Sequence, residues 1–193
     1  MQKIITETER VMNRTIKTAT PNHLEESLEL VEKVFTESEN ADEGKMVRSL
    51  VEEIRSKRFY VPELELIMVD EDDRAVGYVM FSRFHLEGKY ENQLLLLSPV
   101  AVKTELQRQH ISKELIEAGF EKAKEMGYEA VIVEGNPRNY NPRGFKTSCD
   151  YGIVASPSIG LPAPECLIVK ELVEGALDNI KGVVDYSDYE CLT

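Results

Sequence analysis

The chain has 193 residues, of which 42% are hydrophobic and 30% are charged. This balance is typical of a single folded domain, here spanning residues 1–193. The net charge of −12 argues against nucleic-acid binding, because such a chain repels phosphate backbones. The longest apolar runs have the length of strands and fall short of the roughly 20 residues of a membrane helix, so no membrane partner is expected.

The N-terminus and the cysteines indicate a cytoplasmic protein. Residues 1–7 soon become charged and have no apolar core, so no signal peptide is expected. The three cysteines are odd in number and lack metal-type spacing, which favours reduced thiols. The three histidines do not form a metal-like set either. The sequence therefore predicts no metal cofactor.

The first part of the chain predicts a short strand followed by two helices. A strand-like stretch covers 15–18, and Thr20-Pro21 is typical of an N-cap followed by proline at the first helical position. Apolar residues then recur at helical spacing in two segments, which a polar link over 37–44 separates. The two apolar stripes consist of Leu24, Leu28, Val31 and Phe35, and of Val47, Leu50, Val51 and Ile54.

The middle of the chain predicts three strands. Two strand-like runs, 64–69 and 75–81, are joined by a charged turn over 70–74, as in a hairpin. A polar loop is expected over 85–92, before a long apolar strand at 94–102. Pro99 interrupts that strand, and proline lacks the donor that a continuous ladder needs. We therefore expect a bulge or a local break at Pro99.

The rest of the chain predicts a helix and further strands. A polar loop over 103–110 leads into an amphipathic helix over 111–126, which Gly127 ends as a C-cap. An apolar strand follows at 128–134, and a late strand covers 166–172. One more strand is expected at 182–186. The order of elements predicts a mixed α/β fold with a largely antiparallel central sheet flanked by helices.

The strand, loop and helix predicted between residues 94 and 126 are typical of an anion-binding site. This order places backbone N–H groups and the positive end of a helix at one spot, which is a ready site for a pyrophosphate. An acidic protein that binds such an anion must concentrate positive potential locally. Lys103, Arg108, His110 and Lys113 form a basic cluster around the loop.

Several motifs in the same order resemble the GNAT superfamily of N-acetyltransferases, in particular a bacterial single-domain subgroup. Its Leu-x-Pro-x-x-Val and Gly-x-Pro-x-x-Tyr elements correspond to residues 97–102 and 135–140, and its Val-Pro-Glu-Leu element corresponds to 61–64. The resemblance implies a GNAT acyl-CoA N-acyltransferase fold. It also implies an enzyme that transfers an acetyl group from acetyl-CoA to a primary amine by direct attack in a ternary complex.

The resemblance also implies roles for individual residues. Tyr140 precedes a Gly-Phe pair by four residues and would be the general acid that protonates the leaving CoA thiolate; a phenol with a pKa near 10 is protonated at neutral pH. The strand before the loop would offer main-chain groups to pantetheine, and the loop amides would hold the pyrophosphate. The implied cofactor-binding residues are Val100, Ala101, Val102, Gln107, Arg108, Gln109, His110, Ile111, Ser112, Lys113 and Asn136.

Two departures from the family pattern leave alternatives open. His110 and Ser112 stand where glycines are usual, and Arg143 replaces the phenylalanine of the usual Arg-Phe-Gly-Phe. A catalytically weak acyl-CoA-binding or regulatory module, or a scaffold for protein contacts, is therefore an alternative to an enzyme. Small-molecule and protein amines both stay open as acceptors, and the superfamily also allows a homodimer. Glu134, Glu65 and Glu91 are alternatives for the general base.

Overall fold

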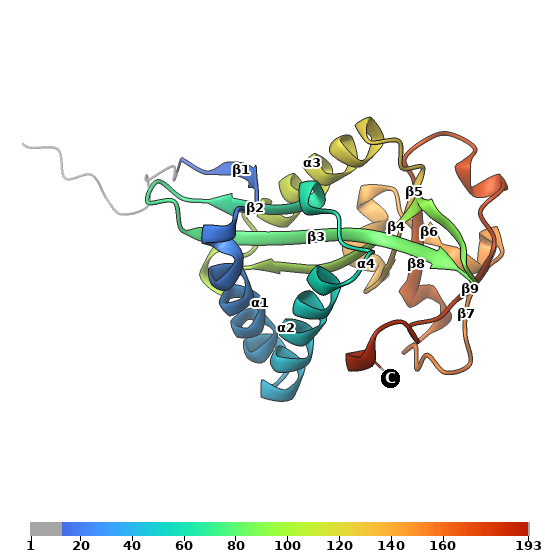
Figure 1. Ribbon diagram of the computed structural model, residues 1–193, viewed down its shortest axis with the longest axis horizontal. Helices are drawn as coiled ribbons and strands as arrows, with labels where there is room; N and C mark the ends of the chain where they lie inside the picture. The colour runs from blue at the N-terminus through green and yellow to red at the C-terminus, as the bar shows by residue number, and fades with distance from the viewer. Residues whose placement is uncertain (1–12, 193) are drawn as a thin grey trace, which may run out of the picture.

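A computed structural model describes residues 13–192 as a seven-stranded sheet between layers of helices (Figure 1). The strand order is β1-β2-β3-β4-β5-β8-β6, and β7 pairs with β9 in a separate two-stranded sheet. The strands are β1 (Thr15–Thr18), β2 (Glu65–Val69), β3 (Ala75–Leu86), β4 (Lys89–Val102), β5 (Ala130–Glu134), β6 (Lys146–Thr147), β7 (Ile153–Ala155), β8 (Leu167–Glu171) and β9 (Gly182–Val184). The helices are α1 (Leu24–Ser38), α2 (Ala41–Ser56), α3 (Ile111–Glu125) and α4 (Pro137–Tyr140).

The strand directions confirm the predicted fold class. Every pair in the seven-stranded sheet is antiparallel except β4 with β5. The prediction of a mixed, largely antiparallel sheet flanked by helices is therefore confirmed. The segment expected to lack a signal peptide lies outside the described residues. Within residues 13–192, no helix is long and apolar enough to cross a membrane.

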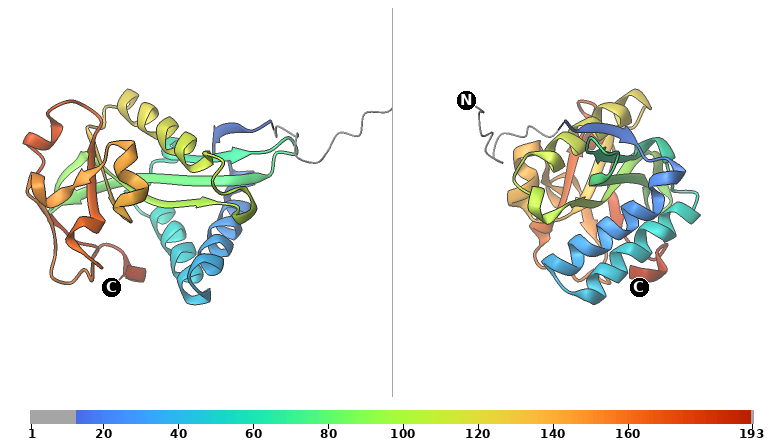
Figure 2. Two further views of the ribbon diagram at one scale, coloured as in Figure 1. Left: turned by 180° about the vertical axis from the view of Figure 1, so that it is seen from behind. Right: turned by 90° about the vertical axis from the view of Figure 1, so that its left-hand side faces the viewer.

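Side-chain alternation along the long central strands builds two hydrophobic layers. Tyr78 and Met80 belong to a core shared with α1 and α2, whereas Val79 and Phe81 belong to a core shared with α3. This period of two is the geometry of a strand covered on both faces. The end-on view shows α3 over one face of the sheet and α1 with α2 over the other (Figure 2).

The link between α1 and α2 is shorter than predicted. The polar link was expected to reach Gly44, but α2 already begins at Ala41, where Asn40 caps it by accepting from the amides of Asp42 and Glu43. Gly44 lies inside the helix because α1 packs closely there: a Cβ atom at Gly44 would lie 2.6 Å from the carbonyl oxygen of Glu32. The glycine thus marks a close helix contact and not a loop.

The predicted loop over 85–92 is also wrong. β3 and β4 form one long hairpin in which Leu86 pairs with Lys89. Only Glu87 and Gly88 make the turn, with φ of 51° and 79°, as two-residue hairpin turns with positive φ require. Polar side chains such as Gln93 dominate the outer end of β4, where no residue is buried, and this polar run was mistaken for a loop.

β4 and β5 diverge beyond the middle of the sheet. They pair only where Leu94, Leu95 and Leu96 face residues 130–132, although β4 continues to Val102. The register of β4 against β3 shifts between the pairs made by Leu97 and Val100, which brackets Pro99 and confirms the predicted bulge. From Leu97 to Val102, β4 therefore has β3 on one side and no paired strand of the described chain on the other.

Candidate active site

The gap beyond the β4–β5 pairing opens into a cleft at the N-terminus of α3. The cleft has a volume of about 690 Å³. Its walls come from the end of β4, the loop before α3, the first turns of α3 and the segment around Tyr140. We call it the basic cleft. The residues that line it are Val34, Val100, Val102, Leu106, Gln107, Arg108, His110, Ile111, Ser112, Lys113, Ile116, Asn139, Tyr140, Pro142 and Arg143.

The basic cleft is built to attract an anion. Arg108, His110, Lys113 and Arg143 line it, and no Asp or Glu of the described chain does. No side chain caps the first turn of α3, so the amides there face the cleft with the positive end of the helix dipole. An acidic chain of net charge −12 thus keeps a locally positive surface in this cleft.

Backbone geometry explains the usual glycine at position 110. His110 has φ of 65° and precedes α3 in the left-handed conformation, which glycine adopts without steric cost. Arg108 is also left-handed, with φ of 62°. Ser112 does not cap the helix; its hydroxyl accepts a hydrogen bond of 3.3 Å from the guanidinium of Arg143. Ser112 and Arg143, which belong to the two separate departures from the family pattern, therefore contact each other.

Eight of the predicted cofactor-binding residues line the basic cleft, and three do not. Those outside it are Ala101, which is buried against α1 and α2, Gln109, which accepts from Arg14, and Asn136, which caps α4 by accepting from the amide of Arg138. Lys103, from the predicted basic cluster, lines a separate cavity. The eight that line it are Val100, Val102, Gln107, Arg108, His110, Ile111, Ser112 and Lys113.

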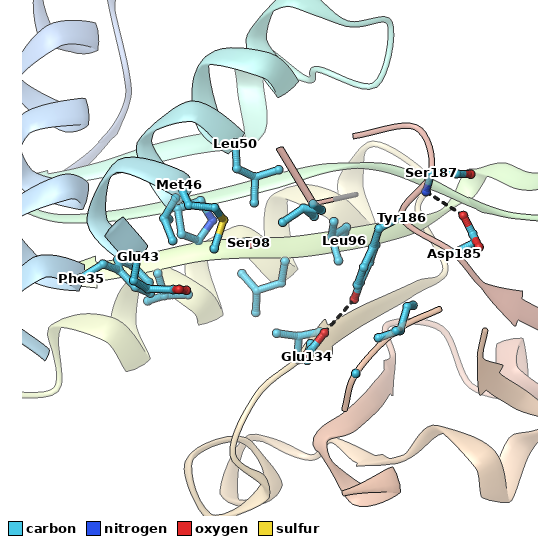
Figure 3. Close-up of a pocket in the computed structure, with 18 of the residues that line it drawn as sticks. Phe35, Glu43, Met46, Leu50, Leu96, Ser98, Glu134, Asp185, Tyr186 and Ser187 are labelled. Carbon is cyan, nitrogen blue, oxygen red and sulfur yellow. Dashed lines mark hydrogen bonds between the residues drawn. The ribbon is translucent and has the colours of Figure 1, made fainter. Parts of the chain in front are cut away.

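A second cavity of about 870 Å³ lies on the other side of β4. Two helices, the diverging ends of β4 and β5, and two segments from the last forty residues line it, so we call it the acidic pocket after its charged side chains. Figure 3 shows Met46 and Leu50 of α2 on one side and Tyr186 with Glu134 on the other. Its walls are Phe35, Glu43, Met46, Val47, Leu50, Leu96, Leu97, Ser98, Pro99, Val100, Val133, Glu134, Tyr140, Ser158, Ile159, Gly160, Asp185, Tyr186, Ser187 and Leu192.

The charged side chains of the acidic pocket are all carboxylates. Glu43, Glu134 and Asp185 line it, and no Lys, Arg or His of the described chain does. Partial burial raises the pKa of Glu134, and the hydroxyl of Tyr186, which donates to it at 3.4 Å, opposes that shift. Hydrogen bonds from Ser187 lower the pKa of Asp185. The two carboxylates thus differ in proton affinity within one cavity.

Tyr140 and Val100 line both cavities. The Tyr140 ring packs edge-on against Phe145 with 5.4 Å between centroids, and a Cβ atom at Gly135 would lie 2.6 Å from this ring. Its hydroxyl makes no hydrogen bond to the described chain. Burial raises the pKa of Tyr140, which the charge of Arg143 partly opposes, so the phenol is protonated at neutral pH and able to donate.

The structure separates the three alternatives for a general base. Glu65 is fully buried and accepts hydrogen bonds from Arg55, Tyr60 and Tyr78. Its carboxylate oxygens are therefore engaged inside the core and do not face a substrate. Glu91 pairs with an exposed arginine at 2.9 Å and lines neither cavity. Only Glu134 shares a cavity with Tyr140.

Sequence reasoning missed most of the acidic pocket. Met46 lies more than a hundred residues before Ile159 and Tyr186 in the chain, and no local pattern joins them. Arg143 was noticed only as a departure, yet it lines the basic cleft. The presence of Arg143 in place of the usual phenylalanine could have indicated an anion-binding residue, because a positive charge replaces an apolar side chain beside a predicted anion site.

Comparisons with known proteins agree with this geometry. The family model described as Acetyltransferase (GNAT) family matches residues 25–145. The uncharacterized N-acetyltransferase YhbS of Escherichia coli strain K12 is 28% identical over 141 residues, which cover 72% of this chain and 80% of YhbS. The uncharacterized N-acetyltransferase YjhQ of the same strain is 32% identical over 61% of each chain.

Solved structures share the fold. The crystal structure of YhbS from Escherichia coli in complex with CoA superposes with a TM-score of 0.79 over 92% of both chains, at 24% identity. A GNAT family acetyltransferase from Brucella melitensis in complex with acetyl-CoA has a TM-score of 0.58 at 26% identity, covering 70% of this chain and 84% of its own. The predicted resemblance and the predicted enzyme class are confirmed: the chain belongs to the GNAT family of acetyl-CoA-dependent N-acetyltransferases.

Proposed function

We propose that this protein transfers the acetyl group of acetyl-CoA to a primary amine, with both substrates bound at once. The observation that carries the proposal is the pair of cavities with opposite charge that meet at Val100 and Tyr140. An anionic donor and a cationic acceptor then each have a cavity of complementary sign. The reacting atoms would meet at the shared wall, where positioning lowers the barrier.

The basic cleft supplies the groups that an acetyl-CoA molecule needs. The amides at the start of α3, together with Arg108 and Lys113, would hold the pyrophosphate. The backbone of β4 near Val100 and Val102, which has no neighbouring strand on one side, would hydrogen-bond the amides of pantetheine. Acetyl-CoA itself supplies an activated thioester.

Tyr140 at the shared wall and Glu134 in the acidic pocket would move protons. Glu134 would accept a proton from the acceptor ammonium, because its raised pKa makes it a better base than an ordinary carboxylate. The neutral amine nitrogen would then bond to the acetyl carbon, and the carbon–sulfur bond would break. Tyr140 would give its hydroxyl proton to the departing sulfur and would regain a proton as the nitrogen loses its second one. The products are then an N-acetyl amide and the free thiol, with the first proton of the ammonium on Glu134.

Isothermal titration calorimetry with acetyl-CoA tests this proposal. We expect micromolar binding for the unchanged protein and at least tenfold weaker binding for Lys113→Glu, which reverses a charge in the basic cleft. Lys89→Glu is the matched control, because Lys89 is exposed at the far end of β4 and should bind as the unchanged protein does. Absence of binding at millimolar acetyl-CoA would favour a degenerate or scaffolding role.

A further inference from the structure

The walls of the acidic pocket are mostly apolar. Phe35 and Met46 come from α1 and α2, Leu96 comes from β4, and Ile159 and Leu192 come from the C-terminal part of the chain. Figure 3 shows several of these side chains turned toward one another across the cavity. With about 870 Å³, the pocket lies within the range of roughly 300–1,000 Å³ that small-molecule sites occupy.

The polar groups of the pocket restrict its ligand further. Its charged side chains are the carboxylates Glu43, Glu134 and Asp185, and no basic residue of the described chain lines it to pair with an anion. Its polar side chains are already partly engaged: Asp185 accepts from the amide of Ser187 and from the hydroxyl of Ser158. A ligand rich in hydroxyls would therefore leave many of them unpaired against apolar walls, which is costly.

These observations separate classes of amine. A free amino acid would bring a carboxylate into a cavity whose charges are all negative. An amino sugar would bring hydroxyls without partners. An amine with one positive charge on a bulky apolar group satisfies both surfaces, because its ammonium meets carboxylates and its body meets the apolar walls.

We propose that the acceptor is a small monocationic primary amine with an aromatic or branched apolar body and no acidic group, bound between α2 and the segment around Tyr186. This inference rests on the proposed acetyl transfer and adds the class of acceptor. Met46 and Leu50 would contact the apolar body. Glu134, which Tyr186 orients by its hydrogen bond, would face the ammonium.

Thiol release from acetyl-CoA with three matched amines tests the inference. 2-Phenylethylamine has the proposed features, phenylalanine adds only a carboxylate, and glucosamine replaces the apolar body with hydroxyls. We expect kcat/KM for 2-phenylethylamine to exceed that for each of the others at least tenfold. Equal or better turnover of phenylalanine, of glucosamine or of a peptide N-terminus would overturn the inference and leave acetyl transfer intact.

A charge placed in the pocket provides an independent test. Met46→Lys should lower kcat/KM for 2-phenylethylamine at least tenfold and reduce the discrimination against phenylalanine, because the new cation repels ammonium and attracts carboxylate. Met126→Lys is the matched control, since Met126 is 41% exposed after α3 and does not line the pocket. A thermal melt confirms that both variants are folded. Unchanged discrimination in a folded Met46→Lys protein would contradict the inference.

Measuring the binding of 2-phenylethylamine in the absence of acetyl-CoA tests the proposed acceptor class separately from the proposed acetyl transfer. Calorimetry that shows amine binding, abolished by Met46→Lys, would support the acceptor class even for a protein that fails to bind acetyl-CoA. Acetyl-CoA binding without binding or turnover of 2-phenylethylamine would contradict the acceptor class alone. Failure of both ligands to bind would overturn both proposals.

Discussion

Tyr140 is a side chain at which the two cavities meet. Its proposed role as a proton donor can be tested by removing only its hydroxyl oxygen. Tyr140→Phe should keep the ring contact with Phe145 and lose the proton donor. We expect kcat to fall roughly 100-fold, the lower range of what a positioned acid contributes, while the Kd for acetyl-CoA changes less than twofold. Steady-state kinetics and calorimetry on the same preparation measure both quantities.

Tyr90→Phe is the matched control for this substitution. Tyr90 donates its hydroxyl to the carbonyl of Asn179 and lines neither cavity, so kcat should stay within twofold. Normal turnover in Tyr140→Phe would remove Tyr140 from its proposed role.

His110 allows a test of backbone strain beside the anion site. A φ of 65° costs an L-residue roughly 1–2 kcal/mol. Glycine relieves this strain, but it loses more conformational entropy on folding, which offsets about 0.5–1 kcal/mol of the gain. His110→Gly should therefore raise the free energy of unfolding by roughly 0.5–1 kcal/mol. Ser112→Gly, inside α3, should lower it by about 1 kcal/mol. Urea unfolding measures both, and a shift of the same sign in both would contradict this account.

The His110→Gly variant also distinguishes the enzyme from a module with a degenerate loop. On the proposed function the loop binds as it stands, so the Kd for acetyl-CoA should change less than threefold. Binding tightened tenfold or more would favour the degenerate loop.

Single residues were predictable where a local pattern carried them. The spacing of Tyr140 before Gly144-Phe145 and the position of Ser112 at a helix start are visible in the sequence. For Asn136 the sequence allows either a contact to CoA or a cap of a short helix, and the structure shows it capping α4. A short polar residue before a helix cannot be assigned from its type alone.

At the scale of the elements, the carboxylate of Glu53 in α2 is one of the groups that hold the C-terminal segment. Glu53 accepts from the amides of Glu190 and Cys191 and pairs with Lys57 at 2.6 Å. Partial burial opposes its ionisation, but the hydrogen bonds from Lys57, Glu190 and Cys191 outweigh it and lower the pKa of Glu53 from 4.5 to about 2. The segment carries Leu192, which lines the acidic pocket, so this clamp shapes the pocket.

Glu53→Gln should loosen the clamp in a pH-dependent way. Because the folded state lowers this pKa, the stabilisation is complete above pH 4.5 and is lost as the pH falls toward about 2. We expect the free energy of unfolding to drop by about 2 kcal/mol at pH 7 and the difference from the unchanged protein to shrink below pH 4.5. Urea unfolding at several pH values measures this difference.

Glu52→Gln is the neighbouring control, since Glu52 is 51% exposed and pairs only with Arg48. It should change the free energy of unfolding by less than about 0.5 kcal/mol. A pH-independent effect of Glu53→Gln would show that the charge of Glu53 is not what holds the segment.

Most elements followed from periodicity, and the exceptions have physical causes. The stripes in α2 and α3 and the apolar run of β5 are buried as predicted, whereas in α1 Leu28 and Val31 are buried but Leu24 and Phe35 are only half-buried. The hairpin of β3 and β4 was missed because the outer end of β4 is mostly polar, although the outer end of β3 still alternates, with Phe84 and Leu86 buried. The partners of β8 and the pairing of β7 with β9 depend on long-range contacts, which no local window contains.

At the scale of the whole molecule, charge is divided between the cavities. The net charge of −12 attracts a cationic amine from a distance, and salt weakens this attraction. Raising NaCl from about 20 to 200 mM shortens the Debye length from roughly 20 to 7 Å, so KM for the amine should rise severalfold. KM for acetyl-CoA should move less, because the basic cleft attracts phosphates while the rest of the molecule repels them. Steady-state kinetics at several salt concentrations check this, and an amine KM that falls with salt would contradict it.

The division of charge was only half visible in the sequence. A basic cluster near the loop could be predicted because Arg108, His110 and Lys113 are close in the chain. The acidic pocket could not, because Glu43, Glu134 and Asp185 are brought together by the sheet and the C-terminal segment. In a chain with 35 acidic residues, no sequence pattern distinguishes these three.

The acidic lining of the pocket has a consequence for turnover. On the proposed function, acetylation would turn the acceptor's ammonium into a neutral amide, so the product would lack the electrostatic attraction that binds the amine. The product would then be held in the cavity without an ion pair. The reaction that consumes the substrate would therefore also weaken the binding of the product and favour its release.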